Sequence, residues 1–292
     1  MKEMSIAVPP LRLQENDNKY ITVNGITIRY IVRGDGPPIL LIHGFGEFVE
    51  SWAFNIEPLS EHYRVYALDL PGHGLSDKPA NGYAFFLSAD FVANFMQTLE
   101  INRATLIGHS IGGFICLSTA INFPEKVDRL VLIDSGGVSK EMPLRYRLAA
   151  LPILGEIMVE PTLKAGLRMG IKGTFYNPDL VTDEMVDMTY KYLRMRGAKR
   201  AMLEIIREST SLRGPVAEAI MTDKLHLIKA PTLVIHGAQD KTVPVDEVEN
   251  ASKLIPKARL AVFEECGHVP HLEKPAEFNE TVLAFLQSER QN

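Results

Sequence analysis

The segment from Thr105 to Phe123 constrains the fold more than any other part of this 292-residue chain. A short apolar run leads into the sequence Gly108-His109-Ser110-Ile111-Gly112-Gly113, and an apolar, helix-like stretch follows until Pro124. A strand that ends at Gly108 and a helix that begins at about Ile111 would place Ser110 on a sharp turn, with its hydroxyl presented outward. The flanking glycines would let the strand and the helix pass too closely for larger side chains. The pattern predicts a serine nucleophile, although G-x-S-x-G alone is weak evidence and a glycine turn with an idle serine remains the alternative.

Continuous apolar runs recur along the chain and predict a parallel sheet. Residues 21–32 first alternate apolar and polar side chains around Asn24-Gly25, which is typical of an antiparallel hairpin. The later runs are uninterrupted, as expected for strands that are buried on both faces. They comprise residues 38–42, 63–70, 104–108, 129–133, 232–235 and 260–263. Helix-like segments separate most of them, so the sequence predicts an α/β fold, a doubly wound and mostly parallel sheet with helices on both faces.

Between residues 137 and 222 this alternation stops and helical spacing takes over. We expect a helical cap here, inserted into a core made of residues 1–136 and 223–292, and closing over the carboxyl ends of the strands where open α/β sheets bind ligands. The insert holds eight of the chain's eleven methionines. Flexible methionine side chains suit an adaptable apolar pocket, but they could equally fill the cap's own core.

The cap is also rich in arginine. We interpret three of these residues as part of a solvated helix face: Arg194, Arg196 and Arg200. An arginine that points inward would instead indicate an acidic substrate.

Two loops far from Ser110 in the sequence could complete a catalytic site. A serine hydroxyl is a poor nucleophile near neutral pH and needs a base, together with an acid that orients the base. Asp240 follows the buried run 232–235, and His268 follows the run 260–263. Parallel strands would deliver both side chains to the edge where Ser110 emerges, in the chain order serine, aspartate, histidine. The sequence therefore predicts the catalytic triad Ser110, Asp240 and His268.

The same edge offers donors for the negative oxygen of a tetrahedral intermediate. Ile111 directly follows the nucleophile, and Phe45 lies in the glycine-flanked loop after the run 38–42. We expect the backbone N–H groups of Phe45 and Ile111 to bind the substrate oxygen. His268 would take the Ser110 proton during attack on a carbonyl and return it to the leaving group.

Other residues compete for these roles. Asp134, after the run 129–133, is the rival for the acid, and His271 is the rival for the base. We expect His271 instead to begin the last helical region and to form local hydrogen bonds. Further histidines are interpreted as structural: His43, His73 and His109. No H-E-x-x-H motif accompanies the two-residue spacing of His268 and His271, so the sequence predicts no metal.

Five motifs in this order resemble the α/β-hydrolase superfamily, specifically its small cap-bearing serine hydrolases, over nearly the whole chain. They are His43-Gly44-Phe45-Gly46, Asp69-Leu70-Pro71-Gly72-His73-Gly74-Leu75-Ser76-Asp77, Gly108 to Gly113, Gly237-Ala238-Gln239-Asp240 with Val243-Pro244, and Gly267 to Pro275. The resemblance implies the α/β-hydrolase fold, the triad and oxyanion donors named above, and no cofactor.

Departures from relatives narrow the expected chemistry. Haloalkane dehalogenases and epoxide hydrolases of this fold use an aspartate nucleophile, so Ser110 argues against both. Carbon–carbon bond hydrolases of ring-fission products usually carry asparagine before the nucleophile and proline in the glycine loop, where this chain has His109 and Glu47. We therefore predict a hydrolase of carboxyl esters with small to medium apolar substrates. Carbon–carbon bond hydrolysis, perhydrolase chemistry and a ligand-binding receptor with an idle triad remain alternatives.

Composition limits the partners. The net charge of −5, from 36 acidic and 31 basic residues, gives no reason to expect nucleic-acid binding. No apolar run reaches about 18 residues and no signal-peptide pattern is present, so we expect no membrane insertion. Two cysteines, Cys116 and Cys266, do not make a disulfide framework and favour a reducing compartment. We predict a cytoplasmic enzyme with a small-molecule substrate and leave its oligomeric state open.

Overall fold

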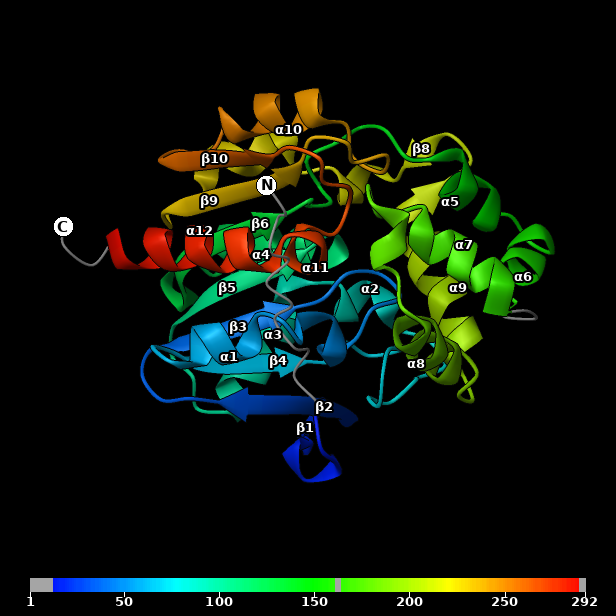
Figure 1. The fold of residues 1–292 in the computed structure, drawn as a ribbon, viewed down its shortest axis with the longest axis horizontal. Helices are drawn as coiled ribbons and strands as arrows, with labels where there is room; N and C mark the ends of the chain where they lie inside the picture. The colour runs from blue at the N-terminus through cyan, green and yellow to red at the C-terminus, as the bar shows by residue number, and fades with distance from the viewer. Residues whose placement is uncertain (1–12, 161–163, 289–292) are drawn as a thin grey trace, which may run out of the picture.

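An eight-stranded sheet forms the centre of the computed structural model, which describes residues 13–160 and 164–288 (Figure 1). The strand order is β1-β2-β4-β3-β5-β6-β9-β10. The β1–β2 and β2–β4 pairs are antiparallel, and the other neighbours are parallel. In chain order these strands span Lys19–Val23, Ile26–Arg33, Pro38–Ile42, Arg64–Leu68, Ala104–His109, Val127–Ile133, Thr232–Gly237 and Ala258–Phe263. The predicted doubly wound, mostly parallel sheet is confirmed.

The turn between β1 and β2 has the geometry that its sequence demands. Asn24 and Gly25 have φ values of 50° and 79°. A two-residue hairpin turn of this kind needs positive φ at both positions, which asparagine and glycine tolerate best.

Strand β3 shows why the parallel strands are apolar throughout. Ile39 and Leu41 pack on one face of the sheet, Leu40 and Ile42 pack on the other, and all four are fully buried. Helices α1 (Ile56–Ser60) and α12 (Pro275–Ser288) cover the first face. Helices α3 (Ala89–Thr98), α4 (Ile111–Asn122) and α10 (Val245–Ser252) cover the second. Because both faces carry helices, no position along β3 can be polar without losing buried apolar area.

The register of the sheet brings the ends of the parallel strands together. Ile42 at the end of β3 pairs with Gly108 of β5, and Ile133 at the end of β6 pairs with His109 and with Ile235 of β9. The loops that carry the predicted site residues therefore leave the sheet at one edge.

Helices α5 to α9 gather beyond this edge, at the right of Figure 1. They span Leu144–Ala149, Leu154–Met158, Lys164–Lys172, Asp183–Leu193 and Ala198–Ser209. Two short strands, β7 (Thr210–Ser211) and β8 (Gly214–Pro215), follow and pair with each other. These strands were not predicted, because two residues are too few to show periodicity. These elements all lie between residues 137 and 222, and the division into core and cap at those positions stays a prediction.

In the described part of the chain, no helix combines the length and the apolar character needed to cross a bilayer. Cys116 on α4 and Cys266 after β10 are buried free thiols.

Candidate active site

Ser110 lies between β5 and α4 in a strained backbone conformation, with φ 52° and ψ −114°. The glycines around it are required by close contacts. A Cβ atom added to Gly108 would lie 2.4 Å from the carbonyl oxygen of Gly112, and one added to Gly112 would lie 2.2 Å from that of Ile42. The Ser110 N–H donates to the carbonyl of Ile133 at 2.9 Å, which holds the turn against β6. Ser110 thus occupies the sharp turn that the sequence predicts.

The three predicted triad residues form a continuous chain of hydrogen bonds. His268 Nε2 lies 3.1 Å from Ser110 Oγ, and His268 Nδ1 lies 2.7 Å from Asp240 Oδ2. The other Asp240 oxygen accepts from the Thr242 N–H at 2.6 Å. Burial opposes ionisation of Asp240, but the His268 imidazole and the Thr242 N–H lower its pKa to about 2. An ionised Asp240 favours the tautomer with the proton on Nδ1, which leaves the Nε2 lone pair facing the serine hydroxyl.

The rival acid, Asp134, has a different partner. Its Oδ1 lies 2.8 Å from His236 Nδ1 and accepts from the Gly237 N–H at 3.0 Å. The carboxylate that contacts His268 is that of Asp240.

The expectation that His271 forms local hydrogen bonds is wrong. Neither of its ring nitrogens has a hydrogen-bond partner among the described residues. The ring instead packs between Trp52 and His109, with ring centroids 4.6 and 4.7 Å away. Burial and the nearby charge of His109 lower the pKa of His271 to about 3, so it is neutral.

Glu47 and His109, the two departures from the carbon–carbon hydrolase pattern, contact each other. His109 Nδ1 lies 3.0 Å from Glu47 Oε2, and His109 Nε2 lies 2.7 Å from the backbone oxygen of His268. Glu47 Oε2 also accepts from the Gly44 N–H at 2.8 Å. One imidazole therefore connects the loop after β3, the nucleophile turn and the loop that carries His268.

Both nitrogens of His109 face acceptors, so the ring donates from both as an imidazolium. Burial opposes this charge, but the Glu47 carboxylate raises the pKa of His109 to about 9. The same pairing lowers the pKa of Glu47, against the effect of burial. The sequence could not predict this pairing, because the two residues are 62 positions apart.

The loop after β3 forms a tight turn from Gly44 to Glu47. The Glu47 N–H donates to the Gly44 oxygen at 3.2 Å, and Gly46 has φ 74°. A turn with positive φ at its third residue favours glycine there. In the described part of the chain, the Phe45 and Ile111 N–H groups have no hydrogen-bond acceptor, so both can serve a ligand.

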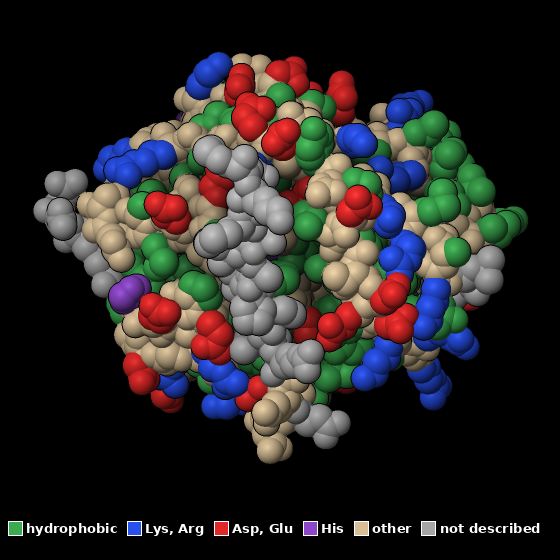
Figure 2. Space-filling view, in the orientation of Figure 1, with side chains coloured by type: hydrophobic (Ala, Val, Ile, Leu, Met, Phe, Trp, Pro, Cys, Tyr) green, Lys and Arg blue, Asp and Glu red, His purple; other side chains and the backbone are tan. Residues whose placement is uncertain are grey.

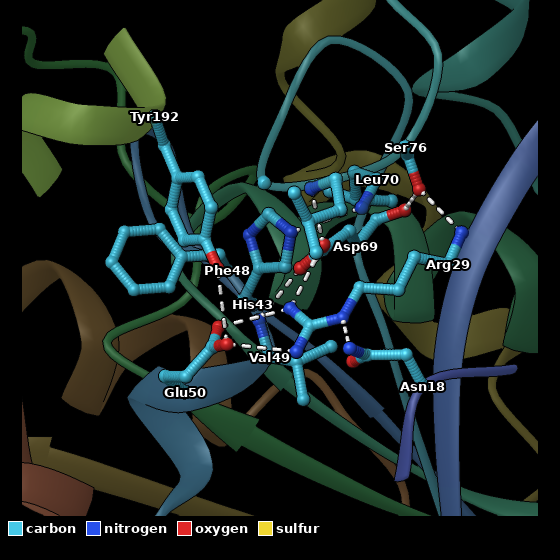
Figure 3. Close-up of polar contacts among 12 residues, drawn as sticks. Asn18, Arg29, His43, Phe48, Val49, Glu50, Asp69, Leu70, Ser76 and Tyr192 are labelled. Atoms are coloured by element: carbon cyan, nitrogen blue, oxygen red, sulfur yellow. Dashed lines mark hydrogen bonds and ion pairs between the residues drawn. The ribbon is translucent and has the colours of Figure 1, made fainter. Parts of the chain in front are cut away.

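A buried ion-pair network holds this loop to the rest of the molecule (Figure 3). The Arg29 guanidinium on β2 donates to both oxygens of Glu50, at 2.7 and 3.0 Å, and to Asp69 Oδ2 at 3.2 Å. Asp69, directly after β4, also accepts from the Val49 N–H at 2.8 Å and the Leu75 N–H at 2.7 Å. These bonds explain why the Asp69 to Asp77 motif begins with aspartate: its carboxylate holds both the segment that contains Val49 and the loop that contains Leu75.

The network extends to the helices over the sheet edge. The Tyr192 hydroxyl on α8 donates to Glu50 Oε1 at 3.1 Å, and its ring packs on Phe48 with centroids 4.6 Å apart. Figure 3 shows this hydroxyl pointing toward the Glu50 carboxylate that Arg29 holds. Tyr192 thereby anchors α8 to the sheet through a partly buried carboxylate that Arg29 also holds.

A cavity of about 1770 Å³ opens between these helices and the sheet edge, and Ser110, His268 and Phe45 contribute to its lining. Much of the rest is apolar. It includes five methionines from residues 137–222: Met158, Met169, Met185, Met188 and Met202. Arg145 on α5 also lines it, whereas Arg194, Arg196 and Arg200 are exposed as expected.

Three groups of histidine and carboxylate residues have potential metal-ligand atoms within 4.8 Å of one another. They are Glu47, His109 and His271; His109, Asp134 and His268; and Asp134, His236 and Asp240. Both nitrogens of His109 already face protein acceptors, and His268 joins Ser110 to Asp240. The absence of a resident metal stays a prediction.

The sequence also matches a known protein family. The model of the alpha/beta hydrolase family matches residues 39–281. The chain belongs to the alpha/beta hydrolase family. A 2-hydroxy-6-oxo-2,4-heptadienoate hydrolase of Pseudomonas putida is 32% identical over 275 residues, which cover 93% of this α/β-hydrolase and 96% of that enzyme.

Solved structures of other members superpose well on this α/β-hydrolase. A meta-cleavage product hydrolase from Pseudomonas fluorescens matches with a TM-score of 0.79 and 29% identity, covering 93% of this chain and 98% of that one. A membrane phospholipase A, described as a bacterial virulence factor, matches with a TM-score of 0.79 and 28% identity, covering 94% and 87%.

The charged state of His109 predicts a pH-dependent stability for this α/β-hydrolase. A pKa raised from about 6.5 in the unfolded chain to about 9 stabilises the fold fully below pH 6.5, and this stabilisation is lost as the pH rises through 9. We expect the wild-type free energy of unfolding to fall by roughly 3 kcal/mol more than that of His109→Asn between pH 6 and 9.5. Urea unfolding at several pH values measures this difference. The exposed His226→Asn is the matched control and should follow the wild type; a wild-type minus His109→Asn difference that stays constant with pH would contradict the charged pair.

Proposed function

We propose that this α/β-hydrolase cleaves carboxyl esters of small to medium apolar substrates through an acyl-enzyme on Ser110. The observation that carries this proposal is the hydrogen-bond chain from Asp240 through His268 to the Ser110 hydroxyl. A hydroxyl 3.1 Å from an imidazole nitrogen can lose its proton to that nitrogen as it attacks a carbonyl carbon.

The proposed reaction has two similar halves. In the first, Ser110 attacks, the His268 imidazolium returns the proton to the leaving alcohol, and the acyl group stays on the serine. In the second, His268 activates a water that releases the acid and frees Ser110. The ionised Asp240 stabilises the imidazolium in both halves.

The Phe45 and Ile111 N–H groups are proposed to bind the oxyanion of each tetrahedral intermediate. Ile111 is the first residue of α4, so the positive end of the helix dipole adds to its N–H. Loss of one such donor typically costs about 10² to 10³ in rate.

An apolar substrate is supported by the cavity, whose methionines can adapt to different shapes. Likeness to a phospholipase A supports an ester as the scissile group.

Carbon–carbon bond hydrolysis of ring-fission products is the second candidate. The relatives that act on a heptadienoate and on meta-cleavage products favour it. So does Arg145, because a guanidinium on the cavity wall could bind the carboxylate of an acidic substrate.

The acid of the triad can be tested with two isosteric changes. We expect Asp240→Asn to lower kcat for a short-chain p-nitrophenyl ester by about 10³ to 10⁴, because the amide holds His268 in the wrong tautomer. Asp134→Asn should change kcat by less than about tenfold in protein whose folding is checked by circular dichroism. The reverse ranking would show that Asp134 is the catalytic acid.

The scissile bond can be tested by comparing two substrates on one preparation. We expect kcat/KM for p-nitrophenyl butyrate to exceed that for a 2-hydroxy-6-oxo-dienoate by at least about tenfold, and Ser110→Ala to abolish both. A preference for the dienoate that falls with Arg145→Gln would identify the second candidate as correct.

A further inference from the structure

Large apolar side chains are exposed along the outer edge of the helices that cover the cavity. We call this set the cap edge: Leu144, Ile153, Leu154, Ile157, Met158 and Met169. Ile153 and Ile157 on either side of the start of α6 are 76% and 67% exposed, and Met169 on α7 is 75% exposed. Figure 2 shows hydrophobic side chains gathered along the right-hand margin, over α5 and α6, with Lys and Arg side chains beside them. Exposed large apolar side chains are normally scattered singly, so the gathering over α5 and α6 indicates a contact surface.

The cap edge lies in the positively charged part of the chain. Residues 137–222 hold 13 Lys and Arg against 10 Asp and Glu, a net charge of +3, whereas the rest holds 18 against 26, a net charge of −8. The acidic residues of the α6 region are neutralised, since Glu156 pairs with Arg207 and Glu160 with Lys199.

Basic residues beside the cap edge lack such partners. Arg145 and Arg147 on α5 have no carboxylate within 4.0 Å among the described residues. Arg147 donates only to the backbone oxygen of Leu212, at 2.7 Å, and Arg145 to the Thr242 hydroxyl, at 3.0 Å. Unneutralised positive charge therefore flanks the exposed apolar side chains.

The cap edge is continuous with the cavity. Met158 and Met169 belong to the exposed set and also line the cavity that contains Ser110. Whatever binds the cap edge therefore lies against the cavity lining as well.

We propose that the cap edge docks on the surface of a bilayer that contains anionic lipids. Exposed apolar side chains flanked by basic ones match the two attractions of such a surface, which are burial at the acyl boundary and the negative potential of the headgroups. A twofold dimer that pairs two cap edges fits less well, because the two positively charged edges would repel each other. Docking needs only the cap edge and does not depend on the proposed ester chemistry.

The apolar contribution is tested by sedimentation of the full chain with vesicles of phosphatidylcholine, with or without an equal amount of phosphatidylglycerol. We expect the wild type and Ser110→Ala to sediment with the anionic vesicles. The double variant Ile153→Ser with Ile157→Ser should bind them at least about tenfold more weakly. Neither isoleucine lines the cavity, so turnover of a dissolved short ester should stay unchanged. Leu254→Ser, which removes a 49% exposed leucine after α10, is the matched control and should bind like the wild type.

The electrostatic contribution is tested by reversing one charge. Arg147→Glu should weaken binding to the anionic vesicles by about 25-fold, at roughly fivefold per unit of charge, and 0.5 M salt should weaken wild-type binding similarly. Lys253→Glu, which reverses an exposed charge directly after α10, should have little effect on binding to these vesicles. Failure of the folded wild type to bind either vesicle would overturn the proposal, as would equal losses in the cap-edge and control variants. A dimer that the double isoleucine variant dissociates would assign the cap edge to a second copy instead.

Discussion

The close approach of β5, α4 and β3 around Gly108 and Gly112 is the constraint on which the rest of the site depends. No side chain fits at either position, because the carbonyl oxygens of Gly112 and Ile42 occupy the space. The chain can turn from strand to helix this tightly only with Ser110 at positive φ, which costs about 1 to 3 kcal/mol of backbone strain. The same contact brings the start of α4 beside the end of β3, so the N–H groups of Ile111 and Phe45 belong to neighbouring loops.

Ion pairs then hold the loops whose positions the close packing around Gly108 and Gly112 does not determine. The His109 imidazolium joins Glu47, the nucleophile turn and the His268 loop, and the Arg29 guanidinium joins Glu50 and Asp69. Removing charges from water is costly, but most hydrogen bonds of these groups are satisfied. Deleting one partner of such a pair typically lowers the stability of a protein by about 3 to 5 kcal/mol, because the other charge is left buried and unpaired. The arrangement favours one geometry of the loops over many nearly equivalent ones.

The sequence was most informative where local chemistry decides the structure. Continuous apolar runs predicted the strands, the Asn24-Gly25 pair predicted the hairpin, and glycine spacing predicted the turn at Ser110. Loop residues after consecutive parallel strands then indicated which side chains meet at the sheet edge.

Contacts between side chains that are far apart in the sequence could not be predicted. The contact of Glu47 with His109 and that of Tyr192 with Glu50 depend on the exact path of several loops, which no periodicity encodes. His271 was misread for the same reason, because its surroundings are the rings of Trp52 and His109 rather than polar neighbours in sequence. The cavity lining, Arg145 included, likewise follows from how five short helices pack.

Covalent labelling of the purified protein with a fluorophosphonate, followed by peptide mapping, tests whether His268 activates Ser110. We expect one label per chain, on Ser110, and a labelling rate that falls by at least about 10² in folded His268→Asn, because only the paired hydroxyl is activated. Folded wild-type protein that stays unlabelled would instead indicate a binding protein with an idle triad, and labelling that is equally fast in His268→Asn would show that the imidazole does not activate Ser110.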